Sequence, residues 1–134
     1  MIFFDTNVLV YFSINQDEKK QNIADSLILS ALSNSEIIIS PLVLIEYLFV
    51  LSKLNQINIQ QDNIAFFKDF SNGSIDTQLV FEAHKICSKI DFCKNINDAI
   101  HLKFAEQYCK KLVTFDSDFY RLKPYADIEI EILE

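Results

Sequence analysis

The chain has 134 residues, half of them hydrophobic, and a formal net charge of −7 at neutral pH. This length and apolar content predict one packed domain over residues 1–134 and exclude a disordered chain. A single glycine and two prolines exclude a glycine-rich phosphate-binding loop and long flexible linkers. The acidic balance gives no electrostatic support for a nucleic-acid partner.

Localisation is predicted from what the chain lacks. No apolar run approaches the roughly 18 residues that a membrane-spanning helix needs, so we expect no membrane segment. The N-terminus has neither the basic start nor the cleavage site of a signal peptide, and none is expected. The cysteines, Cys87, Cys93 and Cys109, are odd in number and form no paired framework. Reduced thiols in a cytoplasmic protein are the simplest explanation.

The first ten residues contain the first candidate site. Residues 2–4 are continuously apolar, which is typical of a strand buried on both faces of a parallel sheet. Asp5 follows directly, and Thr6 and Asn7 can cap the helix that we predict over residues 6–14. A carboxylate just past such a strand lies where open α/β sheets bind ligands. This stretch alone favours neither a binding role for Asp5 nor a simple helix cap.

The next segment contains the second candidate. Apolar spacing predicts a helix over 20–33, and β-branched residues predict a buried strand over 37–40. Ser40 and Pro41 then start a helix that we expect to reach residue 53. Glu46 is the only charge between Glu36 and Lys53, and no basic residue stands three or four positions away to pair with it. We therefore favour a site over a narrow exposed stripe.

The second half repeats the pattern of the first. Helices are predicted over 62–70 and 76–90, with a turn at 71–74 between them and a loop over 91–96 after them. Asn95 or Asn97 is expected to cap the next helix, with Asp98 in its first turn, where an Asp is common for dipole reasons alone. A strand over 112–115 ends on Asp116. A helical turn over 117–122 and an edge strand over 128–132 follow.

Strands that alternate with helices predict an α/β domain with a central, mainly parallel sheet and helices on both faces. Two strands that end on aspartate would place both carboxylates at the same edge of that sheet. If Glu46 and Asp98 join Asp5 and Asp116 there, the four acids need a cation to stay ionised together. An oxygen-only set suits Mg²⁺ or Mn²⁺ rather than Zn²⁺. The matching chemistry is hydrolysis of phosphodiesters.

Four short motifs contain these acids: Phe4-Asp5-Thr6-Asn7, Glu46 after the Ser-Pro helix start, Asn97-Asp98-Ala99, and Thr114-Phe115-Asp116-Ser117-Asp118-Phe119. In order and spacing they resemble the four acidic motifs of the PIN-domain nucleases. Length and compactness are most similar to the VapC-type toxin ribonucleases of toxin–antitoxin pairs. The resemblance implies a Mg²⁺- or Mn²⁺-dependent endoribonuclease that cleaves RNA, frequent homodimers, and a cognate antitoxin that blocks the site.

The resemblance also implies roles for individual residues. Asp5, Glu46, Asp98 and Asp116 match the metal-binding, catalytic carboxylates. Asp118 matches an accessory acid, and Asn7 matches a position that orients the first acid or its water. Small hydroxyl positions near the site are matched by Thr114 and Ser117.

The chain departs from a typical RNA-binding surface, because Arg121 is its single arginine. Five lysines are candidates for RNA contact, although a solvated surface is the favoured interpretation of each. His84 and His101 are interpreted as polar residues of the surface or core edge, and no catalytic role is assigned to them. The phenylalanines are assigned to the core. The candidate lysines are Lys19, Lys20, Lys94, Lys103 and Lys123.

Two other functions fit the same residues. One is a non-catalytic module of this fold that binds RNA or a protein, which four intact acids argue against. The other is a phosphohydrolase with Asp5 as nucleophile. That chemistry usually needs a second acid two residues later, and Asn7 occupies that position.

Overall fold

The structure is a computed structural model that describes residues 1–90 and 96–134. Within these residues, four strands form one parallel sheet in the order β2-β1-β3-β4, so the α/β prediction is confirmed. Ile2 of β1 pairs with Ile37 of β2 on one side and with Lys111 of β3 on the other. The strands are β1 (Ile2–Phe4), β2 (Ile37–Ile38), β3 (Lys111–Thr114) and β4 (Glu129–Ile132).

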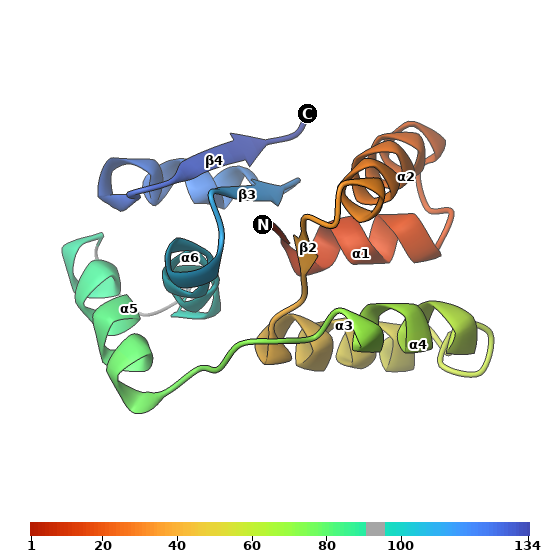
Figure 1. Cartoon of the computed structure of the whole chain (residues 1–134), viewed down its shortest axis with the longest axis horizontal. Helices are drawn as coiled ribbons and strands as arrows, with labels where there is room; N and C mark the ends of the chain where they lie inside the picture. The colour runs from red at the N-terminus through yellow and green to blue at the C-terminus, as the bar shows by residue number, and fades with distance from the viewer. Residues whose placement is uncertain (91–95) are drawn as a thin grey trace.

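Helices cover both faces of the sheet, as predicted. In Figure 1, α1 and α2 lie on one side of the strands and α5 and α6 lie on the other, with α3 and α4 below. The helices are α1 (Thr6–Ser13), α2 (Glu18–Ser33), α3 (Pro41–Lys53), α4 (Gln61–Asp69), α5 (Thr77–Lys89) and α6 (Ile96–Tyr108), followed by the 3-10 turns η2 (Ser117–Arg121) and η3 (Lys123–Tyr125).

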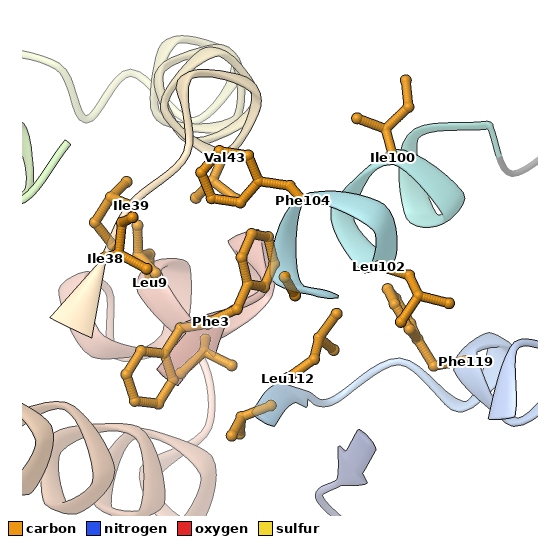
Figure 2. Close-up of a cluster of buried hydrophobic side chains, with 14 of the residues drawn as sticks. Phe3, Leu9, Ile38, Ile39, Val43, Ile100, Leu102, Phe104, Leu112 and Phe119 are labelled. Atoms are coloured by element: carbon orange, nitrogen blue, oxygen red, sulfur yellow. The ribbon is translucent and has the colours of Figure 1, made fainter. Parts of the chain in front are cut away.

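The core is formed where the central strands meet α1 and α6. Phe3 of β1 and Leu112 of β3 are fully buried between Leu9 of α1 and Leu102 of α6 (Figure 2). The ring of Phe104 packs against Phe3 at 5.9 Å between centroids. Burying side chains of this size stabilises the fold by about 1.5–3 kcal/mol each. The position of the sheet edge is therefore held firmly against the flanking helices.

Local signals explain most of the element boundaries. The Ser40 side chain accepts a hydrogen bond from the Val43 backbone N–H, and Pro41 occupies the first turn of α3. The expectation that Asn97 caps α6 is wrong, because α6 begins at Ile96 and Asn97 lies within its first turn. The alternative cap, Asn95, lies outside the described residues, as do Cys93 and Lys94.

One predicted strand is shorter than expected. β2 ends at Ile38, two residues before the predicted end. Ile39 instead forms an isolated bridge with Ser71, because its backbone N–H donates to Phe70 O and its carbonyl accepts from Asn72 N–H. This bridge ties the turn after α4 to the sheet edge. None of the helices among the described residues is long and apolar enough to cross a membrane.

Candidate active site

A cavity of about 420 Å³ opens at the edge of the sheet where β1 and β3 end. Strand β1 leads directly into Asp5, whose backbone N–H donates to Val113 O of β3 at 2.9 Å. The other walls come from α1, α3, α6 and the segment after β3. The lining residues are Asp5, Thr6, Asn7, Val10, Tyr11, Gln16, Glu46, Phe49, Val50, Asp98 and Asp116.

Asp5 both caps a helix and lines the cavity. Its Oδ1 accepts a hydrogen bond from the Thr6 backbone N–H at 2.7 Å, which starts α1. Its Oδ2 accepts one from the Thr114 hydroxyl, also at 2.7 Å. The residue is only 5% exposed, and this burial raises the pKa of its carboxyl despite those bonds. The two interpretations of Asp5 that the sequence left open are therefore compatible.

Glu46 projects from α3 and is held by three neighbours. Its Oε1 accepts hydrogen bonds from the Thr6 hydroxyl at 2.5 Å and from His101 Nε2 at 2.7 Å. Its Oε2 accepts one from Asn97 Nδ2 at 2.9 Å. Burial raises the pKa of Glu46, but hydrogen bonds from His101, Thr6 and Asn97 and the charge of His101 outweigh it and lower the pKa to about 2. Glu46 is therefore an ionised group with fixed oxygens.

His101 is the site residue that the sequence interpretation missed. Its imidazole is 1% exposed, and Nε2 also lies 3.7 Å from Asp5 Oδ1. Because an ionised carboxylate only accepts hydrogen bonds, Nε2 must carry the proton shared with Glu46. The hydrogen bond to Glu46 and the charges of Asp5 and Glu46 outweigh burial and raise the pKa of His101. Its spacing of three residues from Asp98 on α6 was the available signal.

Asp98 enters the cavity from the first turn of α6. Burial is the largest cause of its raised pKa of about 7, followed by repulsion from Asp5. The charges of Asp116 and Glu46 act in the same direction, whereas His101 opposes them. A carboxyl whose pKa approaches neutrality lacks enough positive charge nearby.

Asp116 follows β3 and caps the 3-10 turn η2. Its Oδ1 accepts from the Asp118 backbone N–H at 2.8 Å, and its own N–H donates to the Thr114 hydroxyl at 2.9 Å. That buried hydroxyl joins Asp116 to Asp5 across the two strand ends. Ser117 and Asp118 are exposed on η2 and do not line the cavity, so their accessory roles stay predictions.

Asn7 connects α1 to the segment after β3. Its Oδ1 accepts from the Phe115 backbone N–H at 3.2 Å, and its Nδ2 donates to the Thr114 hydroxyl at 3.4 Å. The Asn7 side chain therefore holds the end of β3 next to α1. Its backbone contact is at Phe115, one residue before Asp116. This geometry suits a positioning role for Asn7 and Thr114.

The donor set fits a divalent cation. The four predicted acids all line one cavity. Burial is the main cause of the raised pKa values of Asp5 and Asp98, and repulsion between the acids adds to it. Among the described residues, Asp5, Glu46 and His101 bring donor atoms within 4.8 Å of one another. Carboxylate oxygens suit Mg²⁺ or Mn²⁺, and His101 Nε2 is already used by Glu46.

Comparison with known families agrees with this site. The profile of the PIN domain family matches residues 2–124. The chain belongs to the PIN-domain family. A comparison with curated proteins finds no match. The matched segment runs from β1 to η3 and includes all four acids of the cavity. PIN domains are generally nucleases and typically use divalent metals, so this chain belongs to a nuclease superfamily.

Proposed function

We propose that this PIN domain is a Mg²⁺- or Mn²⁺-dependent endoribonuclease that hydrolyses phosphodiester bonds in RNA. The observation that carries the proposal is the convergence of Asp5, Glu46, Asp98 and Asp116 on one cavity. These four carboxylates are the predicted metal-binding and catalytic residues. A nucleic-acid substrate accords with the family, and RNA is the expectation from the motifs.

Each side chain has a defined task in this proposal. A bound divalent cation supplies Lewis-acid chemistry and a water of lowered pKa. Thr114 holds Asp5 Oδ2 in place, and His101 and Asn97 hold the two oxygens of Glu46. With a cation bound, Asp98 would be held in its ionised form, because the added positive charge would lower its pKa. The buried backbone around these groups keeps the carboxylates oriented before substrate arrives.

We further propose that the chain is the toxin of a type II toxin–antitoxin pair, acting in the cytoplasm as a homodimer and blocked by a cognate antitoxin. The compact length and the order of the motifs support this proposal. A contiguous apolar face on α3 provides surface for the antitoxin next to the cavity, where the antitoxin would compete with substrate. The exposed residues of this face are Ile45, Leu48 and Phe49.

Cleavage of a panel of structured and single-stranded RNAs tests the nuclease proposal. We expect cutting with Mg²⁺ or Mn²⁺, none with EDTA, and none by Asp5→Ala. Asp62→Ala is the matched control, because Asp62 is exposed on α4 and does not line the cavity. If the chain cuts no RNA and binds no Mn²⁺ in calorimetry, the non-catalytic module is the better description. Cleavage that survives in Asp5→Ala would refute the assigned site.

A further inference from the structure

Two aromatic side chains line the acidic cavity, and each lies beneath a lysine. Tyr11 of α1 has the Lys20 ammonium 5.1 Å from its ring centroid. Phe49 of α3 has the Lys53 ammonium 5.5 Å from its ring centroid. The cavity is thus flanked from two helices by the same combination of an aromatic ring and a cation.

The Tyr11 pair is built from three elements. Lys20 Nζ lies 3.5 Å from the Tyr11 hydroxyl and 5.7 Å from the ring centroid of Phe115. The rings of Tyr11 and Phe115 meet edge to face at 5.1 Å. Phe115 directly precedes Asp116, so this cluster is fixed to the segment that carries a cavity acid. Its position relative to the acids is therefore well defined.

The Phe49 pair is conspicuous because it is exposed. Phe49 is 62% exposed, and leaving that much apolar surface in water has a cost of solvation that a bound partner removes. Lys53 stands four residues later on the same helix, where the two side chains are neighbours. An exposed ring that lines the cavity is well placed to stack with a ligand.

Charge explains why these lysines matter. None of the residues that line the described cavity is Lys or Arg, whereas four are acids. Other lysines are paired with carboxylates: Lys103 with Glu106 at 2.9 Å, and Lys111 with Glu131. Within residues 1–90 and 96–134, neither Lys20 nor Lys53 forms an ion pair with an acid. Their charge is available to a polyanion that approaches the cavity.

We propose that the Tyr11–Lys20 and Phe49–Lys53 pairs are two nucleotide subsites that hold single-stranded RNA on either side of the phosphate to be cleaved. The inference rests on the proposed nuclease function and names how its substrate is held. In each subsite a base stacks on the face of the ring that the ammonium does not cover, and a neighbouring phosphate contacts the ammonium. Unpaired bases are required, because only an unstacked base can expose its face to a side chain.

RNA fits these pairs better than an acidic protein segment does. A phosphate and a base alternate along a single strand, which matches a cation beside a ring at each subsite. The rings accept any base, because every base has a π face, so stacking here is tolerant of sequence. The lysines offset repulsion between the phosphates and the four acids.

Equilibrium binding of a labelled single-stranded oligoribonucleotide tests the subsites. The variants are made in an Asp116→Asn background with Mg²⁺ present, so that bound RNA is not cut. We expect Lys20→Met, Lys53→Met and Phe49→Leu each to weaken binding about fivefold or more. Each lost lysine should reduce the salt-dependence slope by about 0.7, which loss of packing alone would not do. Lys89→Met is the matched control, since Lys89 lies 5.8 Å from the Tyr125 ring and neither residue lines the cavity.

The outcomes separate this inference from the nuclease proposal. Weaker RNA binding with a reduced salt-dependence slope supports the subsites, even if the parent chain cuts no RNA. Absence of cutting would refute only the nuclease proposal. In a chain that does cut RNA, the same substitutions should raise KM and leave kcat within about twofold. Unchanged binding in Lys20→Met and Lys53→Met would overturn the subsites. If Phe49→Leu alters self-association in sedimentation but not RNA binding, the α3 face is a protein interface and the RNA inference fails.

Discussion

The imidazole Nε2 of His101 lies 2.7 Å from Oε1 of Glu46, and this contact joins α6 to α3 beside a carboxylate that lines the cavity. Glu46 Oε1 also accepts from the Thr6 hydroxyl, so one carboxylate oxygen receives two donors. Residues of this kind orient metal-binding carboxylates without touching substrate. His101 is therefore a positioning residue in the proposed enzyme.

Replacing His101 separates its hydrogen bond from its packing. His101→Phe keeps a ring beside Phe3, whose centroid lies 5.3 Å away, but removes the donor to Glu46. We expect Mn²⁺ affinity to fall about 10- to 100-fold, as for other partners of metal ligands. His101→Gln retains an N–H donor and should recover part of that affinity. Isothermal titration calorimetry measures both variants, and wild-type Mn²⁺ affinity in His101→Phe would contradict the positioning role.

Thr114 should stabilise the fold through its hydroxyl rather than its bulk. The side chain is fully buried, and its Oγ1 donates to Asp5 Oδ2 and accepts from the Asp116 N–H. Thr114→Val keeps the volume but leaves both partners unsatisfied, so we expect a loss of about 1–3 kcal/mol in the free energy of unfolding. Thr114→Ser loses only a methyl group, at about 1 kcal/mol. Urea unfolding in EDTA would reject this account if Ser were the more damaging substitution.

The positions of the four acids could be predicted because strand ends and helix starts are local signals. Asp5 and Asp116 directly follow buried apolar runs, and Glu46 interrupts an apolar helix. The partners of Glu46 could not be predicted in this way, since His101 and Asn97 are 55 and 51 residues away. His101 lies in an apolar stretch of α6, and such a pattern indicates core packing. Its role becomes visible only when the position of α3, which carries Glu46, is known.

The connection before α5 was predicted as a turn at 71–74, but Ser71 forms a bridge and residues 72–76 are irregular. The dependence of this connection on packing was not predicted. Gly73 has a φ of +82°, and a Cβ there would lie 2.7 Å from Phe104 Cζ and 3.0 Å from a ring carbon of Tyr108. Because Phe104 is fully buried, its ring cannot retreat freely. The turn residues indicate only the backbone conformation, whereas the ring that excludes a side chain comes from α6.

Gly73→Ala should therefore cost more than conformational strain alone. We expect a loss of about 2–3 kcal/mol in the free energy of unfolding, combining the positive φ with the contact to Phe104. Gly73→Asn tolerates positive φ better but still carries a Cβ, so it should recover only part of the loss. Thermal unfolding compares the two variants. Full recovery by Asn would show that the contact with Phe104 contributes nothing.

The ionisation of Asp98 should make the metal-free fold less stable as pH rises. Burial, followed by repulsion from Asp5, raises the pKa of this carboxyl from 3.8 to about 7. The folded chain then binds the Asp98 proton more tightly than the unfolded chain. Stability from this group is complete below about pH 4 and is lost as pH rises through about 7. Asp98→Asn has no carboxyl to ionise at this position, so its free energy of unfolding should not fall with pH for this reason.

The difference in the free energy of unfolding between Asp98→Asn and the parent should therefore grow between about pH 4 and pH 7 and then level off. We expect it to favour the variant by about 1–2 kcal/mol at the plateau, because solvent partly screens the half-buried carboxylate. Excess Mg²⁺ should reverse the order, since a cation that binds only the folded parent stabilises it by mass action. Urea unfolding across this pH range, in EDTA and in Mg²⁺, measures both effects. A difference independent of pH would show that Asp98 is ionised without cost, and equal stabilisation of the parent and of Asp98→Asn by Mg²⁺ would remove Asp98 from the proposed metal ligands.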